Sequence, residues 1–254
     1  MIAILGLFGL ACLVVVSVWV GVRLMFLAKR TRELPEALLG VGLFLTGGPS
    51  VALGIAPLLI SDPAGETAHW ILRAAVIASA LGAGTVYVFV WYVFRRTEIW
   101  GRLLLAALSL ALLVATVGDL ATREAGQQLF GPNADLGPFG VLSVFPRILA
   151  SVWAAWESFS YCAMMKRRAA IGLADESLAL RFWYWGVAMC AAGLAWVAKL
   201  VDSLLGEANL APEVGAIVMS LMGFLGAYSI FQAFFSKSQS HDSSESNMRP
   251  EGAA

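Results

Sequence analysis

Among the charged residues within long apolar runs or at their ends, where charge is rare, five fall in the halves that are predicted to lie on the outer side of a membrane. Three are basic and two are acidic: Arg73, Arg147, Lys199, Asp119 and Asp202. A charge in the hydrocarbon core of a bilayer costs roughly 2.5–3.5 kcal/mol, so such a side chain faces the inside of a helix bundle or a water-filled cavity. The set is net positive, which favours a small anionic or zwitterionic ligand.

Helical spacing adds further candidates around Arg147. With 3.6 residues per turn, Arg147, Ser151 and Ser158 share one face of their run. Glu157 and Tyr161 stand four residues apart on the flank of that face. Burial favours the neutral form of a carboxyl group, so Glu157 is a candidate inner proton site.

A later run carries a second polar face. Trp196 and Lys199 share that face, and Asp202 follows Lys199 by three residues, a spacing that permits a local ion pair. The candidate ligand-binding residues are therefore Arg73, Asp119, Arg147, Glu157, Tyr161, Trp196, Lys199 and Asp202.

Two interpretations of these residues stay open. In the first they line a cavity that is open to the outer side and binds a ligand. In the second they pair with one another and hold the bundle in register, while Arg147 and Lys199 extend their long stems toward the headgroups. The sequence alone does not decide between a pocket and a structural clasp.

Seven apolar runs position these side chains. The chain has 254 residues, of which 59% are hydrophobic and 13% are charged, about half the charge of a typical soluble domain. A helix of about 20 apolar residues crosses ~30 Å of hydrocarbon, whereas a β-barrel needs short alternating segments. The sequence therefore predicts an all-α integral membrane protein, a seven-transmembrane-helix bundle within residues 1–235, with spans near 2–28, 36–60, 69–94, 99–120, 139–165, 178–205 and 212–235.

Basic residues are unequally divided between the two sets of loops. The loops after the second, fourth and sixth spans contain only one basic residue, Arg123. The loops after the first, third and fifth spans, with their flanks, contain Lys29, Arg30, Arg32, Arg95, Arg96, Arg102, Lys166, Arg167, Arg168 and Arg181. The positive-inside rule then places the N-terminus outside and the C-terminus in the cytoplasm. We expect a multi-pass protein of the inner (plasma) membrane, with residues 236–254 as a disordered polar cytoplasmic tail.

The second span contains Gly47, Gly48 and Pro49 near its middle. Proline removes one helical hydrogen bond and clashes with the preceding turn, so a kink is predicted there. These three residues are hinge candidates for a broken helix that lines a site, and a static bend is the alternative.

Several kinds of chemistry have no support in the sequence. The two histidines, His69 and His241, lie at a membrane edge and in the tail, which excludes bis-histidine haem ligation inside the bundle and leaves no metal site to propose. The comparison with microbial rhodopsins is one of topology only, because the last span lacks a lysine that could link retinal. No nucleotide-binding loop occurs, and zero net charge gives no reason to expect nucleic acid as a partner.

Three function classes follow from this pattern. The first is a receptor-like protein that binds or senses a small ligand from the outer side and acts through a cytoplasmic protein partner. The second is a small-solute or ion- or proton-coupled transporter. A membrane-embedded enzyme comes last, because the sequence contains no recognisable nucleophile or metal-ligand set.

Overall fold

The structure is a computed structural model that describes residues 2–60, 62, 65–124, 136–173, 175–205 and 212–235. The predicted tail, 236–254, lies outside this part of the chain. Helices account for nearly all of the described residues, and no strand occurs among them. The helices are α1 (Ile2–Thr31), α2 (Leu34–Gly47), α3 (Pro49–Ile55), the short 3₁₀ helix η1 (Ala56–Leu59), α4 (Glu66–Phe94), α5 (Ile99–Thr122), α6 (Gly137–Ala170), α7 (Glu176–Leu205) and α8 (Pro212–Phe235).

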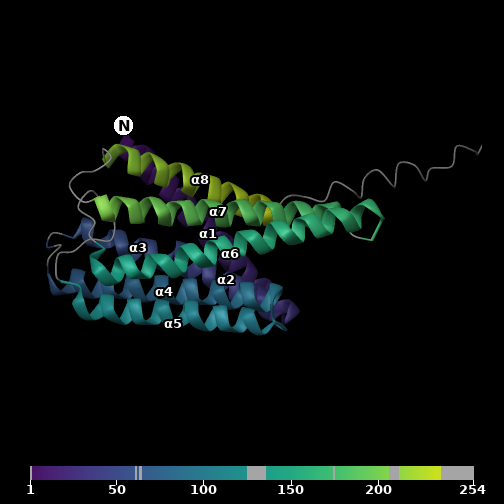
Figure 1. The fold of residues 1–254 in the computed structure, drawn as a ribbon. Coiled ribbons are helices and arrows are strands. Elements are labelled where there is room, and N and C mark those ends of the chain that lie inside the picture. Colours follow the sequence, from purple (N-terminus) through teal and green to yellow (C-terminus); the bar gives the residue numbers. More distant parts are fainter. Residues whose placement is uncertain are drawn as a thin grey trace, which may run out of the picture.

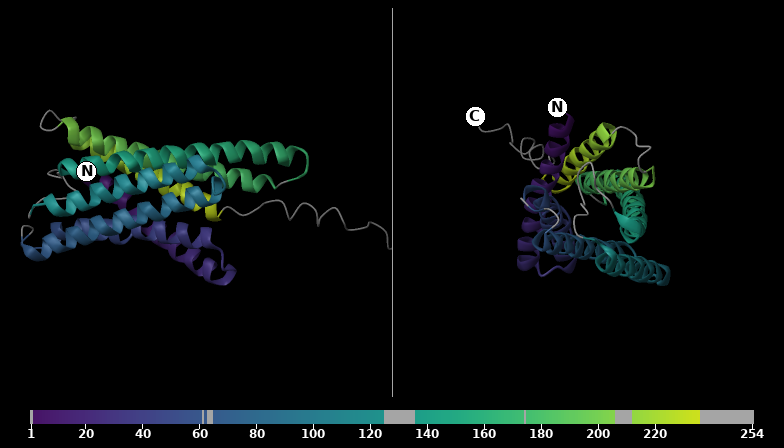
Figure 2. Two further views of the ribbon diagram at one scale, coloured as in Figure 1. Left: turned by 60° about the horizontal axis from the view of Figure 1, so that its bottom comes forward. Right: turned by 90° about the vertical axis from the view of Figure 1, so that its left-hand side faces the viewer.

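The helices pack in the order of the chain. α1 contacts α2, and both α2 and α3 contact α4. From α4 to α7, each helix contacts the one that follows it in the chain. A contact between α1 and α8 closes the ring, which Figure 2 shows in the view along the helices. Ring packing places each helix between two neighbours and leaves one face of each helix on the outside.

The outer surface of this ring is apolar. Trp19, Leu110 and Trp156 are each more than half exposed, whereas Glu157 and Ser158 are buried. Polar groups inside and large apolar groups outside are the reverse of the pattern in a soluble bundle, and they suit contact with lipid.

Six helical segments in the described residues are long and apolar enough to cross a membrane, with α2 and α3 counted as one segment. In α8 the apolar stretch is shorter, from Ser220 to Phe234. The chain is therefore a helical membrane protein, and a seventh crossing by α8 stays a prediction.

The second span is interrupted at the glycine that precedes Pro49. α2 ends at Gly47, and Gly48 has φ −91° and ψ −92°, outside the helical region. α3 then begins at Pro49, whose missing N–H is tolerated in a first turn. The bend thus falls where the sequence predicts a kink, and movement about it as a hinge stays a prediction.

The α6–α7 pair extends beyond the other helices at one end of the bundle (Figure 1). α6 has 34 residues, about 51 Å at 1.5 Å per residue. That length exceeds the ~30 Å hydrocarbon core of a bilayer. This end of the α6–α7 pair contains Lys166, Arg167 and Arg168, so on the predicted orientation it extends into the cytoplasm.

Candidate functional site

Arg147 lies inside the ring, with only 7% of the residue exposed. Its side chain points back toward the start of α6, and Nη1 donates to the carbonyl oxygen of Ser143 at 3.1 Å and to Ser143 Oγ at 2.6 Å. Nη2 donates to Ser79 Oγ of α4 at 3.1 Å. Arg147 therefore joins α6 to α4 through neutral oxygens.

Two aromatic residues complete the surroundings of Arg147. The guanidinium carbon lies 4.9 Å from the ring centroid of Trp196 in α7, within the range of a cation–π contact. Tyr87 of α4 interacts electrostatically with Arg147, and its hydroxyl is buried without a hydrogen-bond partner among the described residues. The structure thus brings together Arg147 and Trp196, two of the predicted site residues.

Arg147 takes part in none of the ion pairs that the described residues form. Asp119 attracts it at longer range, but both Asp119 carboxylate oxygens accept bonds from Arg123 Nη2, at 2.8 and 2.9 Å. The Arg147 Nε atom is also buried without a partner. A buried positive charge is thus held by neutral groups, although burial without a paired counter-ion is costly.

The predicted outer charges lie at two levels. Arg73 donates to the backbone oxygen of Leu120 in α5 at 3.1 Å, and its guanidinium lies over the ring of Trp70. Ser79, the α4 partner of Arg147, comes six residues after Arg73, about 9 Å farther along the helix axis. Arg73 and Asp119 thus lie near the helix ends, whereas the α4 partner of Arg147 lies farther along that helix.

The two remaining predicted charges are in α7. Lys199 is half-buried and engaged in an interaction, so it is not a free cation. The side chain of Asp202 falls outside the described part of the structure, and its pairing with Lys199 stays a prediction.

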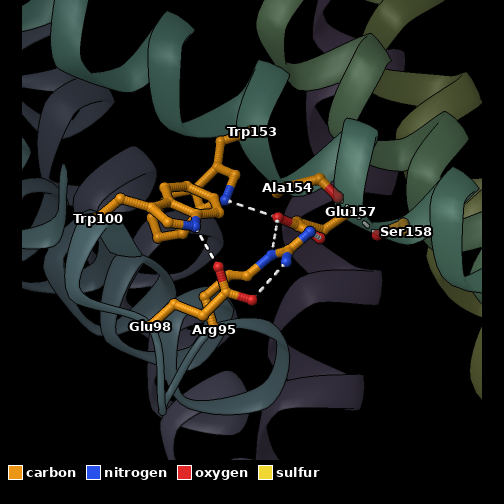
Figure 3. Close-up of polar contacts among 7 residues, drawn as sticks. All are labelled: Arg95, Glu98, Trp100, Trp153, Ala154, Glu157 and Ser158. Atoms are coloured by element: carbon orange, nitrogen blue, oxygen red, sulfur yellow. Dashed lines mark hydrogen bonds and ion pairs between the residues drawn. The ribbon is translucent and has the colours of Figure 1, made fainter. Parts of the chain in front are cut away.

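Glu157 marks a second polar centre, at the end of α4 where Arg95 lies. Figure 3 shows its contacts. Its residue is 1% exposed, and it accepts from Arg95 Nε at 2.7 Å and from Arg95 Nη2 at 3.1 Å. Trp153, one turn earlier in α6, donates its Nε1–H to the same carboxylate at 3.2 Å. Both carboxylate oxygens of Glu157 are thus engaged by hydrogen bonds from within the protein. A role for Glu157 as an inner proton site stays a prediction.

Arg95 connects this carboxylate to the α4–α5 turn. Its Nη1 donates to Glu98 at 2.8 Å, and Trp100 donates its indole N–H to the same Glu98 side chain. Hydrogen bonds to the two carboxylates raise the pKa of Arg95 above its ordinary value, and the bonds from Arg95 and Trp100 lower the pKa of Glu98. The turn between α4 and α5 is thus fixed to α6 by charge-assisted hydrogen bonds.

Tyr161, the neighbour of Glu157 in the predicted stripe, has an aromatic environment. Its ring centroid lies 4.9 Å from that of Phe94 in α4 and 5.6 Å from that of Phe182 in α7. These contacts give Tyr161 a packing role where α4, α6 and α7 meet.

Sequence reasoning missed several residues of these centres. The partner Arg123 could have been predicted, because it follows Asp119 by four residues and so lies on the same face of the helix. The same spacing relates Trp153 to Glu157. Ser79, Tyr87 and the pairing of Arg95 gave no such signal, because they depend on which helices are neighbours.

The fold and the buried charges define a helical membrane protein with two polar centres inside an apolar ring. No family model matches the chain, and no match was found among curated proteins or among solved structures. Within the described residues, no three His, Cys, Asp or Glu side chains gather as a metal site would require. The function is therefore argued from the two polar centres alone.

Proposed function

We propose that the protein is a heptahelical, receptor-like protein of the inner (plasma) membrane that binds a small anionic or zwitterionic ligand from the outer side. In this proposal the chain crosses seven times, with the N-terminus outside and the C-terminus in the cytoplasm. Ligand binding is passed to a cytoplasmic protein partner.

The buried, unneutralised charge of Arg147 is the observation that carries this proposal. Its guanidinium is held by Ser143, Ser79 and the ring of Trp196, and it forms no ion pair with the described residues. A carboxylate or phosphate that approached it would form the charge-assisted bonds that these neutral groups do not provide. Arg147 Nε and the Tyr87 hydroxyl are among the buried donors that have no partner within the described residues, and Arg73 Nε is another.

Arg73 is the cation that favours approach of an anion from the outer side in this proposal. The same end of the bundle also contains Asp62, Glu66 and Glu124, and Arg123 is paired with Asp119, so the attraction is local to Arg73. In this proposal the ligand passes from Arg73 to the level of Ser79, about 9 Å along α4.

One helix contains both polar centres and links the outer side to the inner side. Glu157 follows Arg147 by ten residues in α6, about 15 Å along the axis. A ligand that draws Arg147 away from Ser79 therefore biases the position of the helix that Arg95 holds at Glu157. This connection favours a receptor-like function.

Transport is the second candidate, and the positive charge of Arg73 supports it as well. A transport path would have to pass the level of Glu157 to reach the cytoplasm. That carboxylate is already bound by Arg95 and Trp153, and Tyr161 packs against Phe94 next to it. These contacts close the inner end, so we place the receptor-like function first. A membrane-embedded enzyme has no supporting contact among the described residues and comes last.

The test is ligand-dependent stability of the purified protein and of Arg147→Met. We expect at least one member of a panel of dicarboxylates, phosphate monoesters and amino acids to raise the Tm of the wild type. A ligand at 100 times its Kd stabilises by about 2.7 kcal/mol. In Arg147→Met this rise is lost, while the Tm without ligand is unchanged or higher, because a buried unpaired charge has been removed.

Arg102→Met serves as the control, because it removes an exposed cation at the other end of the bundle. It should keep the full ligand response. If Arg147→Met lowers the Tm by many degrees and keeps the ligand response, Arg147 is a structural clasp and the proposal fails.

A further inference from the structure

The free end of the α6–α7 pair stands clear of the rest of the bundle. The contact between Glu157 and Arg95 sets the level of the α4–α5 turn on α6. α6 then continues from Ser158 to Ala170, 13 residues and about 20 Å beyond that contact. The α6–α7 pair forms the projection seen in Figure 1. We call its part beyond the buried Cys162 the hairpin tip (residues 163–173 and 175–178).

The hairpin tip is ordered by its own hydrogen bonds. The amides of Ile171 and Leu173 donate to the carbonyl oxygen of Arg168 at 3.3 and 2.9 Å, and Gly172 turns the chain with a φ of +73°. After the turn, both carboxylate oxygens of Asp175 accept bonds from Ser177, at 2.9 and 2.6 Å, and these bonds lower the pKa of Asp175. These bonds define the backbone of the turn on both sides of residue 174.

A shallow, open groove runs along one face of α6 from Ser160 to the hairpin tip. Its volume is about 410 Å³, and its lining residues are Ser160, Ala163, Met164, Arg167, Arg168 and Ile171. Ile171 is 70% exposed, and the neighbouring Leu173 is 73% exposed. Apolar side chains are therefore available for contact at this end of the groove.

The charge of the groove is of one sign. Lys166, Arg167 and Arg168 are exposed and form no ion pair within the described part of the chain. The lining includes no acidic side chain. An apolar floor with a basic rim complements an occupant that presents apolar groups and carboxylates together.

The distance from the membrane decides between a lipid and a protein occupant. Headgroups add only about 5–8 Å to each side of the hydrocarbon core. Arg167 and Arg168 follow Glu157 by ten and eleven residues, about 15–17 Å beyond the level of the α4–α5 turn. The basic end of the groove therefore lies past the headgroups, where a soluble partner reaches it more readily than a lipid does, whereas Ser160 lies only about 4.5 Å beyond that turn.

We propose that this groove binds an acidic amphipathic segment of a cytoplasmic partner protein. This proposal rests on the proposed function, because it names the kind of cytoplasmic protein partner and uses the predicted membrane orientation. It does not require a ligand at Arg147. Binding at the groove and ligand response at Arg147 are measured separately, so either proposal can fail while the other stands.

The test uses the full chain in nanodiscs of zwitterionic lipid and a labelled helical peptide of about 16 residues, roughly four turns. The peptide has leucine along one face and glutamate elsewhere, and its anisotropy reports binding. We expect saturable binding that weakens with salt. The double variant Arg167→Glu and Arg168→Glu should weaken it at least about tenfold, which corresponds to roughly 1.4 kcal/mol. Ile171→Ser should weaken it as well, through loss of the apolar contact.

The matched control is the pair Lys29→Glu and Arg30→Glu, which makes the same charge change at exposed positions near the end of α1. It should leave peptide binding intact, and all variants should elute as the wild type does. Equal loss in the control pair, or equal binding of a peptide with glutamine in place of glutamate, overturns the proposal.

Two other occupants would show themselves in the same assay. If anionic lipid added to the nanodisc abolishes peptide binding at unchanged ionic strength, the groove binds lipid and the proposal is overturned. If peptide binds only after Asp242→Asn and Glu245→Gln neutralise part of the chain's own C-terminal segment, that segment is the occupant and the proposal is likewise overturned.

Discussion

Arg95 and Glu157 lie 62 residues apart in the chain and connect the α4–α5 turn to α6. Glu157 is almost fully enclosed, whereas the Arg95 side chain is 29% exposed and also reaches Glu98. The two ends of this network thus differ in energy. Loss of the Glu157 carboxylate leaves the Arg95 cation without its buried partner beside a low-dielectric core. Loss of Glu98 leaves the pair of Arg95 with Glu157 in place.

We therefore expect Glu157→Gln to destabilise the protein by about 2–3 kcal/mol, below the value for a fully buried pair because Arg95 is partly exposed. Thermal unfolding in detergent measures the loss. A double-mutant cycle with Arg95→Gln should give a coupling energy within about 0.5–3 kcal/mol.

Glu98→Gln provides the comparison, because it removes the exposed partner of the same arginine and should have a small effect. Were Glu157→Gln no more destabilising than Glu98→Gln, the buried contact would not hold α6 to the turn.

Helix α1 packs closely against the second span, α2 and α3, at positions where one or both helices have glycine. A Cβ added at Gly21 would lie 2.8 Å from the Gly40 carbonyl oxygen and 2.8 Å from the Phe44 amide nitrogen, both of them backbone atoms. A Cβ at Gly47 would likewise collide with Ser17 of α1. Small residues at these crossings let the helices pack closely, which is how helices associate in lipid.

Gly21→Ala should accordingly destabilise the protein by about 1–3 kcal/mol, because the backbone atoms it meets cannot move aside without separating α1 from α2. Gly84 is a suitable counterpart, since a Cβ there meets nothing within 4 Å. Gly84→Ala should be neutral or stabilising by up to about 1 kcal/mol through helix propensity. Equal effects of the two substitutions on the Tm would show that the close approach contributes no stability.

At the scale of the whole molecule, the ring and its orientation determine which polar centre faces which solution. The two ends of α4 provide direct markers, because Thr67 and Thr97 are both exposed and lie at opposite ends of that helix. The predicted orientation places Thr67 outside and Thr97 in the cytoplasm.

Cysteine labelling of intact cells tests this orientation. With Cys12, Cys162 and Cys190 replaced by alanine, a membrane-impermeant thiol reagent should modify Thr67→Cys and leave Thr97→Cys unmodified until the cells are opened. A third variant, Ser244→Cys, tests the seventh crossing. Its modification in intact cells would mean that α8 does not cross, and the reverse pattern at the two threonine positions would invert the whole arrangement.

The sequence by itself determined which segments are helices and which of them suit a bilayer. Length and apolar content act locally, so the bounds of the six apolar segments follow from them. The helix break before Pro49 is also local, because proline cannot continue the hydrogen bonds of α2. The pair of Asp119 with Arg123 is local as well, because the two residues are four apart on one helix.

Only the tertiary structure decided what the buried charges contact. Arg147 meets Ser79 across 68 residues, and Glu157 meets Arg95 across 62, because α6 lies beside α4 at these two levels of the ring. Helical periodicity fixes the face on which a side chain lies, but the neighbour of that face depends on how all the helices pack. For that reason the sequence could name Arg147 and Glu157 as candidates. The structure shows that Glu157 pairs with Arg95, while Arg147 forms no ion pair with the residues that the structure describes.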